Sequence, residues 1–267
     1  MLGAIIGDIV GSRFEFHGTN DYDFELFTDR CGYTDDSICT IAVADAIVRG
    51  IDYGESLHNW CRKYPHPMGG YGGRFAAWVH SDDPKPYGSF GNGSAMRVSP
   101  VGWWFTGDDV LEEAKKTAEC THNHKAGIEG AQAVAIAISD CLAMFRHGGQ
   151  TPNAQNIAQA LARAKQFYWG DSDIDFNIEQ YRNRFDETCQ GTVPPALWIV
   201  AHSTSFEDAI RQAVSLGADA DTIGAIVGSI AEAIWPIPEP IKTQALSRLP
   251  QDMLTVLTNF RTHLHND

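Results

Sequence analysis

The chain has 267 residues, of which 43% are hydrophobic and 20% charged, so a sizeable core is expected and disorder is not. Its formal charge of −14 argues against general binding to a nucleic-acid backbone. No run approaches the ~18 unbroken apolar residues of a membrane span, and the N-terminus lacks the basic region of a signal peptide. The six cysteines form no CxxC pair, which predicts reduced, mostly buried thiols in a cytoplasmic protein.

Most of the sequence has the apolar spacing of helices. This spacing predicts helices over residues 38–48, 126–145 and 154–166. Pro194 and Pro195 are expected to open the next helix, over ALWIVAHS, because proline suits a first helical turn.

The segment SFEDAIRQAVSLG predicts a further helix. Ser205 is expected to cap it, with Asp208 completing an acidic variant of the capping box and Gly217 ending it. One face of this helix is apolar, through Phe206, Ala209, Ile210, Ala213 and Val214. Strand-like alternation is nearly absent along the whole chain, so we predict an all-α fold with a single domain over residues 1–267.

Loops are predicted over residues 12–34, 62–94 and 146–152, with a second break near 169–175. The segment 62–94 is dense in glycine, proline and aromatic residues. Irregular segments this long are usually functional or disordered, and the aromatic residues argue against disorder. We therefore expect this loop to contribute to a functional site.

Two acidic segments, YTDDSI and LGADADTIG, each precede an apolar helix. Either segment alone is explained by ordinary helix capping. Together they provide oxygen ligands of the kind that suits Mg²⁺, Mn²⁺ or Ca²⁺, enough for two divalent ions if the segments meet. The six candidate ligands are Thr34, Asp35, Asp36, Asp219, Asp221 and Thr222.

The helix after the second acidic segment is rich in small residues. We expect these residues to let neighbouring helix backbones approach closely and so hold the metal ligands in place. They are Gly224, Ala225, Gly228, Ser229 and Ala231.

Five motifs occur in order along residues 1–235: GAIIGDIVGSRFEF, TDDS, GNGSAMRVSPVGWW, THNHKAGIEGAQAVAIAI and LGADADTIGAIVGSIAEAIW. In this combination the chain resembles the ADP-ribosylglycohydrolases, which include the dinitrogenase-reductase-activating glycohydrolases. The resemblance implies an all-α orthogonal helical bundle around two Mg²⁺ ions, with Mn²⁺ as an alternative. It also implies hydrolysis of the bond between C1″ of ADP-ribose and an acceptor, which reverses mono-ADP-ribosylation and releases ADP-ribose. The acceptor would be a protein, a nucleic acid or a small molecule.

The resemblance also assigns residues. It matches the six oxygen-bearing candidates to the metal ligands, and Glu15 to an acidic residue near metal and substrate. The segment from Gly91 to Arg97 matches a loop that lines the ADP-ribose cleft, and the segment around His122 and Gly127 matches one that contacts the ribose and phosphates. Ser37 stands where threonine is common in the family, and keeps the hydroxyl.

Several roles stay open at this point. Asp35 or Asp36 is expected to orient or deprotonate the attacking water, and Glu15 is an alternative base or a gate over the ions. Backbone N–H groups of the glycine-rich loop are plausible diphosphate contacts, and Arg97 is a candidate either for phosphate or for a structural ion pair. Loop residues proposed to bind substrate are Gly91, Asn92, Gly93, Ser94 and Met96.

Each of three aromatic side chains has two possible roles. Tyr87 and Phe90 are expected to stack on adenine or to pack in the core, and His122 to reach the ribose or to cap a helix. Two alternative functions also remain: hydrolysis of free derivatives such as O-acetyl-ADP-ribose, and an immunity or binding protein that blocks an ADP-ribosyltransferase. The presence of all six candidate ligands argues against a catalytically dead form of the second.

Overall fold

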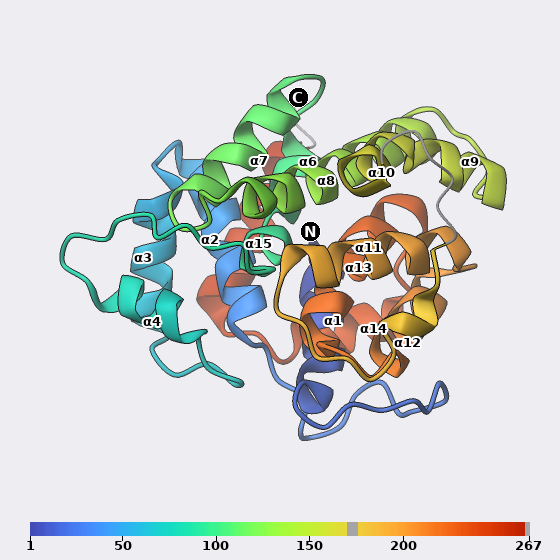
Figure 1. Ribbon diagram of the computed structural model, residues 1–267, viewed down its shortest axis with the longest axis horizontal. Coiled ribbons are helices and arrows are strands. Elements are labelled where there is room, and N and C mark those ends of the chain that lie inside the picture. The colour runs from blue at the N-terminus through green and yellow to red at the C-terminus, as the bar shows by residue number, and fades with distance from the viewer. Residues whose placement is uncertain (170–175, 265–267) are drawn as a thin grey trace.

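The structure, a computed structural model, describes residues 1–169 and 176–264, and these residues form helices and no strand (Figure 1). The predicted all-α fold is confirmed. The first half of the chain contains α1 (Leu2–Gly11), η1 (Ser12–Phe14), α2 (Asp35–Arg49), α3 (Tyr53–Lys63), α4 (Gly73–His80), α5 (Gly93–Met96), α6 (Ser99–Trp104), α7 (Asp109–Glu119) and α8 (Lys125–Cys141). The second half contains η2 (Leu142–His147), α9 (Ala154–Ala160), α10 (Ala162–Trp169), η3 (Ile178–Gln180), α11 (Cys189–His202), α12 (Phe206–Ser215), α13 (Ala220–Ile234), α14 (Glu239–Leu246) and α15 (Gln251–Leu264).

Helix α13 lies at the centre of the fold, in contact with α1, α8, α11 and α12. It runs antiparallel to α1, and glycines on the two helices face each other, Gly3 against Gly228 and Gly7 against Gly224. A Cβ atom on Gly7 would lie only 2.7 Å from the backbone nitrogen of Ala225 and nearer still to the Gly224 carbonyl. The predicted close approach of helix backbones is therefore confirmed, and it fixes the N-terminus of α13 beside the C-terminal end of α1.

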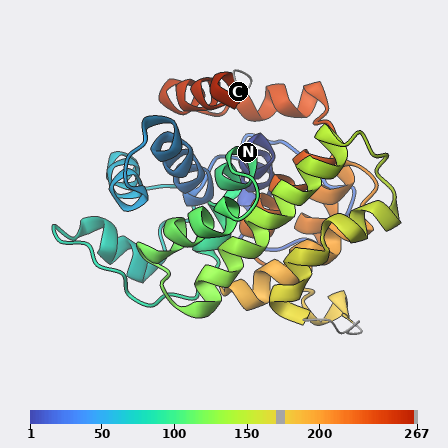
Figure 2. The same ribbon diagram turned by 90° about the horizontal axis from the view of Figure 1, so that it is seen from above.

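The peripheral helices surround this centre. Figure 2 shows α15, in red, along one edge of the molecule, where it packs against α2. Residues Lys125–His147 are long and apolar enough to cross a membrane by length and composition alone, with a mean hydropathy of 1.4. However, 61% of its apolar 18-residue stretch is buried inside the protein, so this segment packs as a core helix. The six cysteines are all free thiols, five of them buried, as predicted.

The Ser205 cap and the apolar face predicted for α12 are confirmed, and the capping box is not. The Ser205 side chain accepts a hydrogen bond from the Asp208 backbone nitrogen, and the five predicted apolar residues are buried. The reciprocal bond differs from a capping box, because the Asp208 carboxylate accepts from the Thr204 nitrogen instead of the Ser205 nitrogen. Gly217 follows the helix with a φ of +72°, a conformation that favours glycine.

Two predicted boundaries are wrong. Pro194 and Pro195 do not open α11, because this helix begins at Cys189 with Thr188 as its cap, and the prolines lie inside it. Residues 154–166 form parts of two helices, which are divided at Leu161. The helices predicted over residues 38–48 and 126–145 are present. The first is part of α2, which begins three residues earlier, at Asp35, and the second runs from α8 into the π-helical turn η2.

The predicted loop over residues 62–94 is also only partly correct. It contains α4, which forms because Phe75, Trp78 and Val79 provide an apolar face that becomes buried. The predicted loops over residues 12–34 and 146–152 contain no α-helix, although the first begins with the short η1 turn and the second with the end of η2. Of the break predicted near 169–175, Trp169 is the last residue of α10, and residues 170–175 lie outside the described residues.

Candidate active site

The first acidic segment forms the N-terminus of α2. Thr34 is its cap, with its Oγ1 accepting a hydrogen bond from the Asp36 nitrogen at 3.2 Å. Asp35 and Asp36 follow in the first turn, where carboxylates are favoured by the helix dipole. Helix capping thus explains Thr34. It does not explain why Asp35 and Asp36 both lie in the first turn, because one side chain is enough to cap a helix.

The second acidic segment forms the N-terminus of α13 and meets the first. The Thr222 hydroxyl donates to Asp36 Oδ2 at 3.3 Å, which joins two segments that are 186 residues apart. Asp219 stands at the cap position without capping the helix, since its side chain accepts no bond from the α13 backbone. Its Oδ2 instead accepts a hydrogen bond of 2.7 Å from the Asn92 side chain, which ties the glycine-rich loop to this acidic cluster.

A fifth carboxylate, Asp8 of α1, lies behind this junction and is fully buried. It accepts hydrogen bonds from the backbone nitrogens and the hydroxyls of both Thr34 and Ser37. Burial nevertheless raises its pKa to about 6, because these four donors offset only part of the desolvation cost. Asp8 was not among the predicted site residues, although a single acid inside the apolar segment GAIIGDIVG is a visible signal for one.

Burial, followed by mutual repulsion, raises the pKa values of the carboxyl groups in the cluster. Burial first, and then the charge of Asp221, raise the pKa values of Asp35 and Asp36 well above the ordinary range. Burial raises the pKa of Asp219 to about 7. It also raises that of Glu15 to about 8, with further contributions from Asp221, Asp8 and Glu187.

Two oxygen atoms of the cluster have no partner. Oδ1 of Asp36 and Oδ1 of Asp221 are buried and accept no hydrogen bond. Leaving a buried carboxylate oxygen unpaired is costly, and such atoms in native proteins usually indicate an absent ligand or a functional role. The cluster therefore has the unsatisfied acceptors that a cation would require.

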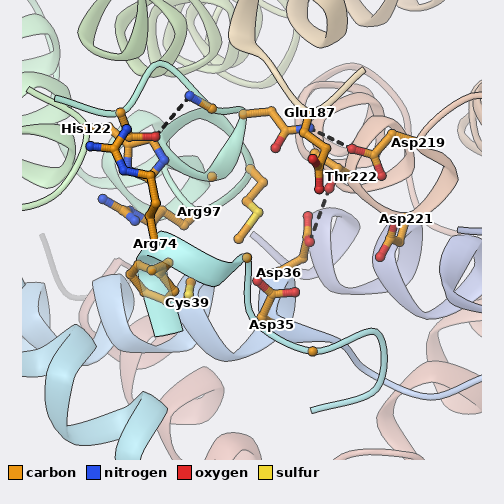
Figure 3. A pocket seen from close by; sticks show the side chains of 18 of the residues that line it. Asp35, Asp36, Cys39, Arg74, Arg97, His122, Glu187, Asp219, Asp221 and Thr222 are labelled. Atoms are coloured by element: carbon orange, nitrogen blue, oxygen red, sulfur yellow. Dashed lines mark hydrogen bonds between the residues drawn. The ribbon is translucent and has the colours of Figure 1, made fainter. Parts of the chain in front are cut away.

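The cluster forms one end of a cavity of about 280 Å³. Arg74, Arg97 and His122 lie at the opposite end, and Figure 3 shows them apart from the acidic side chains. The pKa of His122 is lowered by burial and by the two arginines, so its ring is neutral at pH 7. The pocket is thus acidic at one end and basic at the other.

The glycine-rich loop runs between the two ends, because Asn92 bonds to Asp219 at the acidic end and Gly93 lies against His122 at the basic end. His122 Nε2 lies so close to Gly93 that a Cβ there would be 3.1 Å from it, a tight contact. His122 Nδ1 is 2.7 Å from the Thr121 hydroxyl, and that hydroxyl also accepts a bond from Arg97. Arg97 has no carboxylate in any ion pair of the described residues, and it donates to the Thr117 carbonyl as well. The structural ion pair considered for Arg97 is therefore not present.

Most of the predicted site residues line this one pocket. The residues that do so are Glu15, Asp35, Asp36, Tyr87, Gly91, Asn92, Gly93, Met96, His122, Asp219, Asp221 and Thr222.

Four predicted residues do not line the pocket. Thr34 is buried behind it, and the Ser94 hydroxyl donates to the Gly127 carbonyl in the interior. Gly127 is packed so closely that a Cβ would lie 2.7 Å from the Ser89 carbonyl oxygen. Phe90 lines a separate surface hollow next to His124.

Other residues line the pocket without having been predicted, among them Glu187, Phe185 and Arg74. The first two are brought there by an isolated β-bridge between Gly91 and Thr188. Such a bridge joins residues 97 positions apart and leaves no local pattern in the sequence.

The pocket of this all-α fold thus has acidic helix N-termini at one end, two arginines at the other and a glycine-rich loop between them. The chain belongs to the ADP-ribosylglycohydrolase family, whose model matches residues 1–265. It is an ADP-ribosylglycohydrolase by this membership, as the resemblance of its motifs implied.

Several relatives are similar over most of the chain. The ADP-ribosylarginine hydrolase Tri1 of Pseudomonas putida is 24% identical over 95% of this chain and 76% of its own length. The human ADP-ribosylhydrolase ARH3 is 23% identical over 88% of this chain and 84% of its own length. The ADP-ribosyl-[dinitrogen reductase] glycohydrolase of Rhodospirillum rubrum is 24% identical over 93% of this chain and 88% of its own. An uncharacterized protein of Archaeoglobus fulgidus is 31% identical, but the match spans only 55% of this chain and half of that protein.

Proposed function

We propose that this chain is a metal-dependent hydrolase of the glycosidic bond between C1″ of ADP-ribose and an acceptor, and so reverses mono-ADP-ribosylation. The acceptor is an ADP-ribosylated protein, nucleic acid or small molecule, and ADP-ribose is the product. The observation that carries the proposal is the meeting of the α2 and α13 N-termini, joined by the hydrogen bond from Thr222 to Asp36. Family membership supports the reaction class.

The acidic cluster fits two Mg²⁺ or Mn²⁺ ions by its chemistry. Its donors are carboxylates and hydroxyls, which these hard cations prefer. A bound cation would pair with the unpaired oxygens of Asp36 and Asp221. Its positive charge would also lower the raised pKa values of the carboxyl groups in the cluster. In the described part of the chain, no three His, Cys, Asp or Glu side chains already converge as a ready-made site, so ion binding would draw the ligands together.

When bound, the ions would provide Lewis-acid activation of water and fixed contacts for ribose hydroxyls. The side chains of Asp35 and Asp36 would orient the attacking water and accept its proton. Glu15, half-buried and lining the pocket, is the second candidate for proton transfer, because it is a carboxyl group next to the acidic cluster whose pKa is raised by burial and by the charge of Asp221. Backbone N–H groups of the glycine-rich loop, together with Arg74 and Arg97 at the opposite end, would bind the diphosphate.

The substitutions Asp35→Ala and Asp221→Ala test this assignment, with the exposed Asp82→Ala as the matched control. Each of the first two removes a ligand, so we expect hydrolysis and Mg²⁺ binding to be lost while the far-UV circular dichroism stays unchanged. Magnesium binding is measured by calorimetry, independently of turnover. Wild-type activity in both variants would show that the cluster is not the metal site.

A further inference from the structure

Asp8 is buried beside the acidic cluster but does not line the pocket. Its neighbours in α1 are all buried apolar residues or glycines. A buried carboxylate costs stability unless its oxygens are paired or hydrogen-bonded. In the described part of the chain, the hydrogen bonds that Asp8 accepts all come from Thr34 and Ser37. Its role therefore lies at the N-terminus of α2.

The Asp8 carboxylate caps α2 from another helix. Its Oδ2 accepts hydrogen bonds of 3.0 Å from the backbone nitrogens of Thr34 and Ser37, the cap residue and the third residue of α2. In a capping box, a glutamate or glutamine at the third position reaches back to the cap nitrogen. Ser37 occupies that position and instead donates its own hydroxyl to Asp8. The backbone that carries Asp35 and Asp36 is thus held on both sides by one residue of α1.

Asp8 also sets the direction of the Thr34 hydroxyl. This hydroxyl has one proton and two carboxylate oxygens within reach, Asp8 Oδ1 at 2.8 Å and Asp36 Oδ2 at 3.4 Å. The proton goes to Asp8, because that contact is the shorter one. The Thr34 oxygen accepts one bond, from the Asp36 nitrogen, and a hydroxyl has two acceptor positions, so one stays free. Asp8 thus keeps the Thr34 proton away from a carboxylate of the acidic cluster.

The same helix also holds the second acidic segment. A Cβ on Gly11, one turn after Asp8, would lie 2.6 Å from the Cα of Asp221, so the α1 backbone directly contacts the start of α13. The two acidic helix ends are therefore aligned against α1, one through the Asp8 carboxylate and the other through backbone contact. Their alignment brings Thr222 and Asp36 together at 3.3 Å.

Capping alone does not account for a carboxylate at this position. The Thr34 side chain already caps α2, and one side chain is enough for a helix end. Burying a charge in an apolar helix is costly even when it is hydrogen-bonded, as Asp8 is. Groups that hydrogen-bond the residues of a metal site orient them, and their loss typically costs about ten- to hundredfold in metal affinity.

We propose that Asp8 is a positioning residue for the cation site, which fixes the backbone of the first acidic segment and directs the Thr34 proton away from the acidic cluster. This inference rests on the proposed metal-dependent function. Since Asp8 does not line the pocket, it acts through Thr34 and Ser37. A site held this rigidly favours Mg²⁺, which demands near-ideal octahedral geometry, over Ca²⁺, which accepts irregular geometry.

The test measures Mg²⁺ and Ca²⁺ affinities of the full chain by calorimetry, without substrate. Asp8→Asn places an NH₂ group against N–H and O–H donors, so the first acidic segment should lose its fixed geometry. We expect the Mg²⁺ affinity to fall about ten- to hundredfold and the Ca²⁺ affinity to fall less than about threefold. A variant that only populates the folded state less would lose both affinities in the same proportion.

Two further variants make the test specific. Ser37→Ala removes one hydroxyl bond to Asp8 and leaves the backbone bond in place. It should lower Mg²⁺ affinity about two- to fivefold in the wild-type protein and less than about twofold in Asp8→Asn, because there the bond is already lost. Ile157→Ala, in a buried position of α9 outside the pocket, is the destabilised control. It should lower Tm and leave the ratio of the Mg²⁺ and Ca²⁺ affinities unchanged.

The possible failures are distinguishable. Equal losses of Mg²⁺ and Ca²⁺ affinity in Asp8→Asn, or additive effects of Asp8→Asn and Ser37→Ala, would overturn the positioning role and leave the metal site standing. If Asp8→Asn does not fold, Ser37→Ala decides, and an unchanged affinity ratio in that variant overturns the proposal. A wild-type protein that binds neither ion would overturn the metal dependence of the proposed function, and this inference with it.

Discussion

The contact between α1 and α13 leads to a prediction about stability. In Gly7→Ala the new Cβ would lie 2.7 Å from the Ala225 nitrogen, where ordinary contacts are 3.4–4 Å, so it is too close by at least about 0.7 Å, and by more at the Gly224 carbonyl. The obstacle is backbone, which cannot rotate away as a side chain would. The helices must therefore separate along an interface that also includes Gly3 and Gly228.

The expected magnitude follows from two opposing effects. Overpacking a core typically costs about 1–3 kcal/mol and occasionally more, and a contact with rigid backbone belongs at the upper end. Alanine in place of glycine inside a helix returns about 1 kcal/mol through helix propensity. We therefore expect Gly7→Ala to lower the free energy of unfolding by about 2 kcal/mol, which corresponds to a fall in Tm of about 4–8 °C.

The assay is thermal and urea unfolding, with Gly73→Ala as the matched control. Gly73 begins α4, and a Cβ there meets no atom within 4 Å, so this variant should be as stable as the wild type or slightly more stable. Because α13 carries Asp221, the Gly7 variant should also bind Mg²⁺ more weakly. A Gly7→Ala protein with wild-type Tm would refute the view that backbone contact holds the two helices in place.

Two more predictions concern buried carboxylates. Asp8→Asn replaces an acceptor oxygen with an NH₂ donor facing Thr34 or Ser37, and should cost about 1–3 kcal/mol in chemical unfolding; unchanged stability would mean that these bonds contribute nothing. The pKa of Asp219 rises from its ordinary 3.8 to about 7 on folding, so the stability that protonation gives is fully present below about pH 4 and is lost as pH rises toward 7. Asp219→Asn does not titrate, so in EDTA its Tm relative to wild type should increase from pH 4 to 7, and a constant difference would contradict the assigned shift.

Features encoded locally could be predicted from the sequence. The α12 cap at Ser205, its buried face and the small residues of α13 all follow from short-range patterns, and the structure confirms them. The two acidic segments could be found for the same reason, since each is a run of a few residues before an apolar helix.

Features that depend on distant contacts could not be predicted. The start of α11 at Cys189 is set by the Thr188 cap, and the tolerance of Pro194 inside the helix is not visible in a propensity pattern. Glu187 and Phe185 reach the pocket only because their segment pairs with the glycine-rich loop. The sequence shows that Asp8 is an acid within an apolar helix, but it does not show that Thr34 and Ser37 are its hydrogen-bond partners.

The most direct test of the proposed function is the release of ADP-ribose in the presence and absence of divalent metal. The wild-type protein is treated with EDTA and then assayed on arginine-linked, serine-linked and nucleic-acid-linked ADP-ribose and on O-acetyl-ADP-ribose, before and after Mg²⁺ or Mn²⁺ is added. We predict that at least one of these substrates releases ADP-ribose only after the metal is restored. Full release in the continued presence of EDTA would contradict the metal-dependent mechanism.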